Sequence, residues 1–370
     1  MLSSSDEDRL LLIPGPTPVA REILDALATP TISHNSKQFA AMFLSVLDQL
    51  RSVLGTEAGK VFVFSGSGTL AQETAIINFV EPSDVLLVAS NGFFGDRLSE
   101  IATAHGLKVA SRQSTWGESL TPDEVGQAIQ ETGATVVAFT HVETSTGAMA
   151  QLPQLCETIR AHGALSIVDG VAAFGGVPEP MDEIGIDVLL CGTQKALGVP
   201  PGLGIVAAGQ NAWSKRAGRE APMTAFYADL SRWLPVMEQP DRYFSTHSIN
   251  LVYALHKGLE LIAREGLPQR YRRHKEMAER FRAGMLSMGF ELFTAVEFLA
   301  PTLSALKTPP GVRSSDFRER LRLNGVVAAA GLNDVDDRVI RFGHMGNIAD
   351  AEIAVALDAV KRTLSGYGAH

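Results

Sequence analysis

The chain has 370 residues, of which 45% are hydrophobic and 20% are charged, a composition typical of globular proteins and unlike disordered or fibrous ones. Its formal net charge of −9 comes from 32 basic and 41 acidic residues without a basic block, which disfavours a nucleic-acid-binding surface. Two cysteines, Cys156 and Cys191, are too few for a disulfide framework or a zinc site, and no apolar stretch approaches the roughly 18 residues of a membrane span.

The first ten residues are rich in serine and acidic residues, which argues against a signal peptide and favours a cytoplasmic protein. The length is that of a protein with two domains. We expect residues 1–20 to form an N-terminal arm, residues 21–255 a large domain and residues 256–370 a small C-terminal domain.

Short apolar runs alternate with helix-like stretches between about residues 61 and 208. The runs cover residues 61–64, 85–89, 135–139, 165–168, 187–190 and 203–207. Several are apolar at consecutive positions, as strands covered on both faces are. The alternation predicts an α/β fold with a mostly parallel sheet flanked by helices. In such sheets, ligands bind outside the carboxyl ends of the strands.

The pattern changes after about residue 250. Residues 251–266 and 267–288 are predicted to form helices, the second of them long, charged and amphipathic. A shorter mixed pattern follows, with strands expected at residues 302–306, 326–330 and 339–342 and a helix at residues 314–323. This part is the predicted small α+β domain.

A loop rich in small residues, 65–69, connects the first predicted strand to a helix that begins near Leu70. Residues 66–71 match a dinucleotide-binding fingerprint, but the next strand is followed by Ser90 and Asn91 rather than by an acidic residue. A P-loop would need Gly-Lys-Ser/Thr, which is absent. A single phosphate held by backbone N–H groups and hydroxyls at the helix N-terminus fits best, with a plain glycine-rich turn as the alternative.

Two further residues follow predicted strands of the same sheet. Asp169 can hold a cationic ring nitrogen, although a turn or helix-cap role is common for an aspartate there. Lys195 lies between a strand and a Gly/Pro-rich loop, where burial would lower its pKa and let it attack an aldehyde. A lone lysine is more often a solvated one. A phosphate cradle, a carboxylate and a lysine together are what pyridoxal phosphate (PLP) requires.

Eight short segments complete the pattern in order along the chain. They are Pro14-Gly15-Pro16-Thr17, residues 65–69, Asn91-Gly92-Phe93-Phe94-Gly95, Glu143-Thr144-Ser145-Thr146-Gly147, Val168-Asp169-Gly170-Val171, residues 193–198 with 200–202, Tyr243-Phe244-Ser245-Thr246, and residues 341–346. Through them the chain resembles the class V aminotransferases of fold type I, most closely the alanine/serine–glyoxylate (pyruvate) aminotransferase group. The resemblance extends from about Leu12 to Ile348.

The resemblance implies a role for each matching residue. Lys195 would be the Schiff-base lysine and the acid/base at the substrate Cα, and Asp169 would pair with the pyridine nitrogen. The other implied cofactor contacts are Ser67, Gly68, Thr69 and Gln194 at the phosphate, Phe94 and Val171 on the two ring faces, and Thr144. Arg341 would bind the substrate carboxylate, with Gly15 and Thr144 or Ser145 completing the substrate pocket. Tyr243 and Thr246 would reach the cofactor phosphate of the neighbouring subunit, which implies a homodimer.

One departure from the group concerns the donor. Many relatives carry His-Arg-Ser where this chain has His34-Asn35-Ser36. The missing arginine makes an acidic donor such as aspartate less favoured. His34 and Asn35 either contact the substrate or cap a turn. A second departure is Ala329-Ala330-Gly331 in place of a more glycine-rich turn.

The resemblance implies PLP-dependent, ping-pong transamination from alanine or serine to glyoxylate or pyruvate. The alternative donors within the group are 2-aminoethylphosphonate, ureidoglycine and pyridoxamine. Cysteine desulfuration is disfavoured, because it needs a nucleophilic cysteine late in the chain and none follows Cys191. A catalytically silent PLP-binding protein is disfavoured by the presence of both Lys195 and Arg341. The expected partners are small amino acids and 2-oxo acids, without nucleic acid or membrane.

Overall fold

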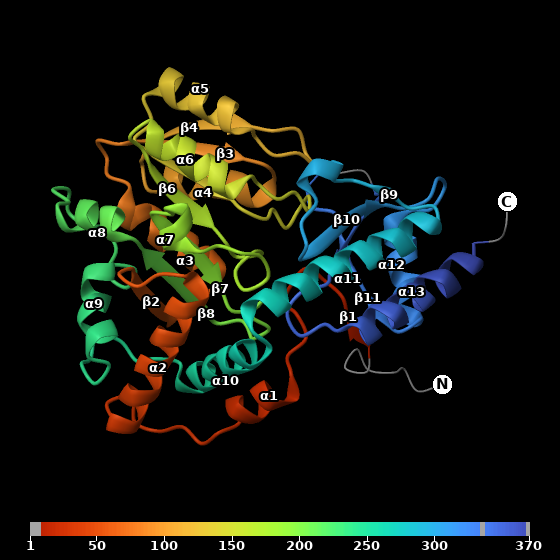
Figure 1. Cartoon of the computed structure of the whole chain (residues 1–370), viewed down its shortest axis with the longest axis horizontal. Helices are drawn as coiled ribbons and strands as arrows, with labels where there is room; N and C mark the ends of the chain where they lie inside the picture. Colours follow the sequence, from red (N-terminus) through yellow and green to blue (C-terminus); the bar gives the residue numbers. More distant parts are fainter. Residues whose placement is uncertain (1–8, 334–336, 368–370) are drawn as a thin grey trace.

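A seven-stranded sheet lies at the centre of the larger part of the molecule in the computed structural model, which describes residues 9–333 and 337–367 (Figure 1). Its strands, in spatial order, are β2 (Lys60–Ser65), β8 (Leu203–Ala208), β7 (Val188–Gly192), β6 (Leu165–Asp169), β5 (Val136–Thr140), β3 (Val85–Ser90) and β4 (Lys108–Gln113). Strand β8 runs antiparallel to both neighbours, and the other pairs are parallel. The predicted mostly parallel sheet is confirmed.

The central strands require cover on both faces. Strands β5, β7 and β8 are buried at every residue, as expected where helices flank a sheet on both sides. Six helices follow strands of this sheet along the chain: α3 (Gly68–Phe79), α4 (Phe93–Ala104), α5 (Pro122–Thr132), α6 (Leu152–Ala161), α7 (Met181–Ile184) and α8 (Gln210–Ala217). Helix α3 packs against α4, and α5 packs against α6.

Four helices border the β2 side of the sheet: α1 (Arg21–Leu27), α2 (Lys37–Leu54), α9 (Leu230–Glu238) and α10 (Ile249–Glu265). Helix α10 packs against α1 and α2. Its Leu259 and Ile262 belong to the apolar cluster of the seven-stranded sheet. The predicted domain boundary after residue 255 therefore falls inside α10, and the division of the chain at that residue stays a prediction.

The C-terminal part is built on a small antiparallel sheet with the order β12 (Ala329–Ala330), β13 (Val339–Gly343), β10 (Leu303–Lys307) and β9 (Glu291–Leu292). Three helices pack beside it, namely α11 (Leu267–Ser287), α12 (Ser314–Leu323) and α13 (Asp350–Ser365), and a short 3-10 turn, η2, spans Val296–Phe298. A second apolar cluster, which includes Phe281, Phe317 and Phe342, fills this part.

The N-terminal arm links the two parts. Strand β1 (Leu10–Leu11) pairs in parallel with β11 (Val326–Val327) of the C-terminal part, and Leu12 joins its apolar cluster. The arm then reaches the loop after β7, where the backbone N–H and the hydroxyl of Thr17 donate to the carbonyls of Gln194 and Lys195 at 3.0 and 2.8 Å. The arm thus positions its Pro14-Gly15-Pro16 turn beside Lys195.

The predicted strands differ from the structure in several places, and the short strands β1 and β9 are absent from the prediction. Strand β4 is absent from the predicted elements because it is a partly exposed edge strand with the polar sequence Lys-Val-Ala-Ser-Arg-Gln. The strand expected at residues 326–330 is two short strands that pair with different partners, β11 with the arm and β12 with β13. Within the described residues, no helix combines the length and apolar character needed to cross a membrane.

Candidate active site

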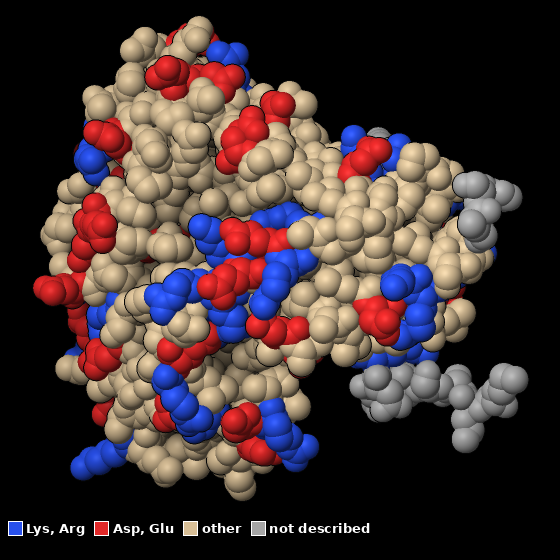
Figure 2. Space-filling view, turned by 45° about the vertical axis from the view of Figure 1, so that its right-hand side comes forward, with Lys and Arg blue, Asp and Glu red and all other residues tan. Residues whose placement is uncertain are grey.

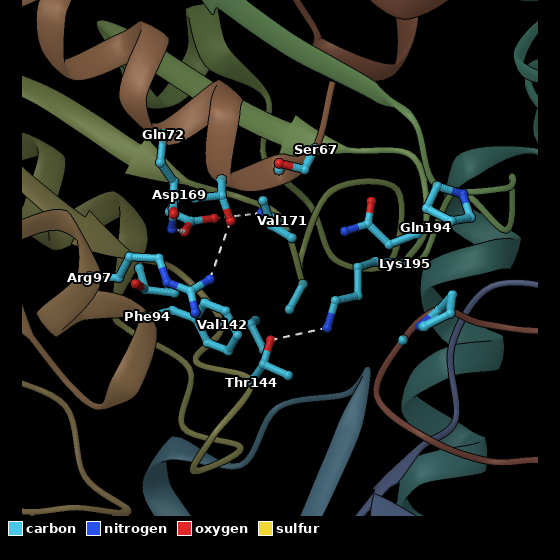
Figure 3. Close-up of a pocket in the computed structure, with 17 residues that line it drawn as sticks. Ser67, Gln72, Phe94, Arg97, Val142, Thr144, Asp169, Val171, Gln194 and Lys195 are labelled. Atoms are coloured by element: carbon cyan, nitrogen blue, oxygen red, sulfur yellow. Dashed lines mark hydrogen bonds between the residues drawn. The ribbon is translucent and has the colours of Figure 1, made fainter. Parts of the chain in front are cut away.

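The loops at the carboxyl ends of β5, β6 and β7 surround a cavity of about 310 Å³ (Figure 3). The start of α3, the first turns of α4 and the turn of the N-terminal arm complete its walls. Ten of the residues selected from the sequence line it: Gly15, Ser67, Gly68, Thr69, Phe94, Thr144, Asp169, Val171, Gln194 and Lys195. The cavity therefore lies where ligands of open α/β sheets bind.

Lys195 follows β7 and is 7% exposed. Its Nζ donates to the Pro14 carbonyl at 2.5 Å and to Thr144 Oγ1 at 3.3 Å. The pKa of Lys195 is lowered to about 7, first by burial and then by the nearby Arg341 cation, while Asp169 and Glu143 act in the opposite direction. A substantial fraction of this amine is therefore unprotonated at neutral pH, as attack on an aldehyde requires.

Asp169 ends β6 and is 1% exposed. Its Oδ2 accepts from Gln72 Nε2 at 2.5 Å, and its Oδ1 accepts from the Val171 backbone N–H at 2.8 Å. Burial raises the pKa of this carboxyl group, although the two hydrogen bonds and the Lys195 charge favour its ionised form. A cation bound in the cavity would stabilise the carboxylate in the same way.

Helix α3 directs its N-terminus at the cavity. Ser67 caps the helix, with its Oγ accepting from the Leu70 N–H at 3.2 Å, so the first helical residues are Gly68 and Thr69. A Cβ added at Gly68 would lie 3.1 Å from Val171 Cγ2, which explains why the smallest residue stands there. The exposed N–H groups of a first helical turn form an anion site.

Phe94 and Val171 both face the cavity (Figure 3). Phe94 lies in the first turn of α4, and the Arg97 guanidinium lies 4.7 Å from the centre of its ring. Gly15 has a φ of +132°, and a Cβ there would lie 2.5 Å from Lys195 Cδ. Any larger residue at position 15 would therefore displace the lysine side chain.

Arg341 is adjacent to the cavity without lining it. The side chain is 8% exposed and extends from β13, where its Nε donates to the Ala330 carbonyl at 2.7 Å and its Nη1 to the Thr144 carbonyl at 2.9 Å. Thr144 thus separates the guanidinium from the Lys195 amine, because its hydroxyl accepts from Lys195. Ser145 is turned away from the cavity and donates its hydroxyl to Glu143 Oε1 at 2.7 Å.

Tyr243 and Thr246 do not line the cavity of their own chain. Both are exposed, and 64% of Tyr243 is accessible. The ring of His34 packs against Tyr243 at a centroid distance of 5.4 Å. Asn35 is exposed, and Ser36, rather than either of its two predecessors, caps α2. His34 therefore lies beside Tyr243, and neither His34 nor Asn35 lines the cavity that holds Lys195.

The structure adds residues that sequence reasoning missed. Gln72, Arg97 and Thr140 line the cavity. Gln72 follows Gly68 by four positions and Arg97 follows Phe94 by three, spacings at which helix side chains share one face. That spacing could have identified both residues once Gly68 and Phe94 were selected.

Polar atoms of the cavity wall that have no hydrogen-bond partner show whether the cavity fits PLP. Gln72 Oε1, Thr140 Oγ1 and Gln194 Oε1 are buried and make no hydrogen bond within the described residues. Buried polar atoms of this kind are normally paired. A phosphorylated pyridine aldehyde would bring oxygens that can accept from the Thr140 hydroxyl and a protonated ring nitrogen that can donate to an amide oxygen. The amine, the carboxylate and the helix N-terminus are placed on its walls, so the residues fit the cofactor.

Comparisons with known proteins agree with this geometry. The family model Aminotransferase class-V matches residues 19–335. The chain is 35% identical over 368 residues to the soluble hydrogenase 42 kDa subunit of Anabaena cylindrica, covering 98% of this chain and 95% of that protein. It is 32% identical over 365 residues to the L-aspartate–glyoxylate aminotransferase of Paracoccus denitrificans, covering 97% and 91%.

A solved structure shows the same fold over nearly the whole length. The crystal structure of alanine–glyoxylate aminotransferase from Nostoc sp. superposes with a TM-score of 0.93 at 32% identity, covering 96% of this chain and 95% of that one. The resemblance inferred from the sequence motifs is thereby confirmed. The chain belongs to the class V aminotransferases and is a PLP-dependent transaminase.

Proposed function

We propose that this transaminase transfers the amino group of a small amino acid, alanine or serine, to glyoxylate or pyruvate by a ping-pong mechanism. One observation carries the proposal: the Lys195 amine, the Asp169 carboxylate and the N-terminus of α3 share one cavity, and Arg341 adjoins it across Thr144. The names of the relatives from Paracoccus denitrificans and Nostoc sp. support glyoxylate as the acceptor.

The cofactor contacts are proposed from the placement of the side chains. The first turn of α3, with Ser67 and Thr69, would hold the phosphate beside Gln194, and Phe94 and Val171 would enclose the ring. PLP, when bound, supplies an electron-withdrawing ring and accepts the amino group between the two half-reactions. Asp169 would keep the ring nitrogen protonated, because burial without a cation destabilises its carboxylate.

Lys195 is proposed to hold the cofactor aldehyde and then to move the proton at the substrate Cα. Its depressed pKa suits a group that must alternate between acid and base near neutral pH. Arg341 would accept the substrate carboxylate on its planar fork and so orient the Cα–H bond. Gly15 and Thr144 would form the wall around the small donor side chain.

The charges of the cavity bear on the choice of donor. Lys195 and Arg97 are the cations among the described residues that line it. Arg97 is engaged with Thr69 Oγ1 at 3.3 Å and with the Phe93 and Phe94 rings. This leaves little positive charge for a phosphonate donor, so 2-aminoethylphosphonate is the weaker candidate. Ureidoglycine and pyridoxamine, which carry no phosphonate group, remain the alternative donors.

We also propose that the active unit is a homodimer in which Tyr243 and Thr246 reach the phosphate site of the neighbouring subunit. Both residues are exposed and neither lines the cavity of its own chain, which supports this assignment. A cytoplasmic location stays a prediction from the sequence.

The donor is tested by kcat/KM of the PLP-loaded enzyme for L-alanine, L-serine, L-aspartate and 2-aminoethylphosphonate, with glyoxylate as acceptor and the glycine product quantified. Pyruvate is the second acceptor for the three donors other than alanine, because transfer from alanine to pyruvate gives no net product. We expect alanine or serine to exceed aspartate and the phosphonate. A preference for 2-aminoethylphosphonate would contradict the donor assignment, and no amino product from any donor would contradict the transaminase function.

An Arg341→Gln variant is the matched control for the same assay. Loss of a charge-assisted hydrogen-bond pair costs about 3 kcal/mol, so kcat/KM for alanine is expected to fall about 100-fold. Turnover of 2-aminoethylphosphonate, which has no α-carboxylate, is expected to change little. An equal loss of kcat/KM for both donors would show that Arg341 does not bind the substrate α-carboxylate.

A further inference from the structure

Glu143 is a buried carboxylate that the proposed chemistry does not use. It follows β5 in the loop that returns through the isolated bridge between Val142 and Met149, and its exposed fraction is 0%. It does not line the cavity, yet it lies at the same edge of the sheet. Burying a charge without hydrogen-bond partners is costly, so the groups that bond to the Glu143 carboxylate indicate its role.

The two oxygens of Glu143 hold two different segments. Oε2 accepts from the backbone N–H groups of Phe94 and Gly95, at 3.0 and 3.1 Å, in the first turn of α4. Oε1 accepts from the backbone N–H and the hydroxyl of Ser145, at 2.9 and 2.7 Å. Three of the four donors are backbone N–H groups and the fourth is the Ser145 hydroxyl, and the α4 N-terminus favours negative charge.

The junction between the two segments is tightly packed. Gly92, with a φ of +153°, precedes α4, and a Cβ at this position would lie 2.5 Å from Ser145 Oγ and 2.7 Å from Glu143 Cγ. The Ser145 hydroxyl also accepts from the Phe93 N–H at 3.1 Å. The start of α4 is therefore joined to the loop after β5 by hydrogen bonds from three consecutive backbone N–H groups, those of Phe93, Phe94 and Gly95.

Both segments carry groups of the site. Phe94 brings its ring to the cavity from α4. Thr144 lies between Glu143 and Ser145 in the loop, and it accepts from Lys195 Nζ at its hydroxyl and from Arg341 Nη1 at its carbonyl. The position of the ring and the positions of the two cations thus depend on one carboxylate.

We propose that Glu143 is a positioning residue that joins the Phe94 turn of α4 to the Thr144 loop, and so sets the distance between the ring-stacking face and the groups that hold the amine and the substrate carboxylate. The inference rests on the proposed function of Phe94, Lys195 and Arg341. Its negative charge also balances the two buried cations, since it acts to raise the pKa of both Lys195 and Arg341.

Glu143→Gln tests the proposal with little change in volume. An amide has one acceptor oxygen and an NH₂ group, so either the Phe94–Gly95 side or the Ser145 side loses its acceptor. The matched control is Asp187→Asn at the opposite edge of the sheet. Asp187 is half-buried and also accepts from a backbone N–H and a hydroxyl, both of Ser166, at 2.9 and 3.1 Å.

Three readouts separate positioning from a general loss of stability. They are amide hydrogen exchange of the peptide at residues 92–98 in the cofactor-free protein, visible circular dichroism of the PLP-loaded protein, and the division of any kinetic loss between kcat and KM. A misplacement of about 1 Å costs on the order of 100-fold in rate. We expect Glu143→Gln to accelerate exchange at residues 92–98, alter the visible signal and lower kcat/KM by about 10- to 100-fold.

Asp187→Asn is expected to lower the melting temperature comparably and to leave all three readouts at the wild-type value. Wild-type exchange, visible signal and kinetics in Glu143→Gln would overturn the proposal. If Glu143→Gln does not fold, Ser145→Ala removes one donor of the same junction, and the same readouts are expected to change in the same direction by a smaller factor; unchanged readouts there would also overturn it. Failure of the wild-type protein to bind PLP would instead contradict the proposed function, and the exchange data would still decide the role of Glu143.

Discussion

At the scale of single residues, the site is a set of buried charges that stabilise one another. Lys195 interacts electrostatically with Asp169 and Glu143, and Arg341 interacts with Glu143, with each group nearly removed from water. Burial destabilises every ionised form, so the pKa of each carboxyl group rises and the pKa of each cation falls. The result is a lysine whose amine is available at neutral pH without a dedicated base.

The first prediction concerns the pH dependence of this amine. Only the unprotonated amine attacks an aldehyde, and the pKa of Lys195 is about 7. The rate of PLP capture by the cofactor-free protein should therefore rise about tenfold per pH unit below 7 and level off above it. In Arg341→Met the midpoint should move upward, because a cation that lowers this pKa is gone.

The capture rate is measured by stopped-flow absorbance between pH 5 and 10. A wild-type midpoint near 10.5, or a midpoint that Arg341→Met leaves unchanged, would contradict the electrostatic account.

The lowered pKa of Lys195 also determines how this group changes the free energy of unfolding with pH. Between pH 7 and 10.5 the folded protein binds fewer protons at Lys195 than the unfolded chain, so this group makes the free energy of unfolding rise with pH in that window.

How far the sequence predicts the site depends on the residue. Lys195, Asp169 and Gly68 could be found because each follows an apolar strand, and strand ends meet at one edge of a parallel sheet. Gln72 and Arg97 come from helix interiors, where a polar residue usually faces solvent, so their sequence context carried no signal by itself. Ser145 matches a motif but turns to Glu143, because the buried carboxylate needs its hydroxyl.

At the scale of elements, three segments from distant parts of the chain meet at the lysine loop. The N-terminal arm supplies the Pro14 carbonyl, the loop after β5 supplies Thr144, and β13 supplies Arg341 to that loop. Contacts of this kind follow from tertiary packing. Periodicity could predict β7 and β5 as buried strands, but it could not predict that β4 would form an edge or that β1 would pair with β11.

The segment from Gln239 to Ser248 is predicted to contribute to PLP binding in the neighbouring subunit. It exposes Tyr243 and Thr246, which the account assigns to the neighbouring subunit. A hydrogen bond to a charged group contributes about 1.5–3 kcal/mol, so Tyr243→Phe with Thr246→Val should weaken PLP binding at least tenfold. Mixed dimers of this double variant with Lys195→Ala should regain one site of wild-type affinity.

Such dimers can be purified through two different affinity tags and titrated with PLP by fluorescence. In a symmetric dimer, the subunit that retains Lys195 would receive an intact Tyr243 and Thr246 from its partner. Weak binding in the mixed dimer would show that the two residues act within their own subunit. A monomer that binds PLP tightly would contradict the shared site altogether.

At the scale of the whole molecule, the two parts are joined at the start of α11. Arg270 donates to the carbonyls of Gly175 and Ala196, the latter directly after Lys195, and Arg273 donates to those of Gly346 and Ile348. Glu265 pairs with both arginines. The face shown in Figure 2 has basic and acidic residues interleaved rather than separated into fields of one sign. Basic side chains on this face therefore lie next to acidic ones.

The central claim is that this chain binds PLP at Lys195 and cycles it between an amino donor and an oxo acid. The most direct test is the visible absorption spectrum of the purified protein after addition of PLP, then L-alanine, then glyoxylate. The account predicts a yellow protein whose visible band is lost with alanine and restored with glyoxylate, and no such cycle in Lys195→Ala. A wild-type protein that stays colourless after PLP is added would contradict it.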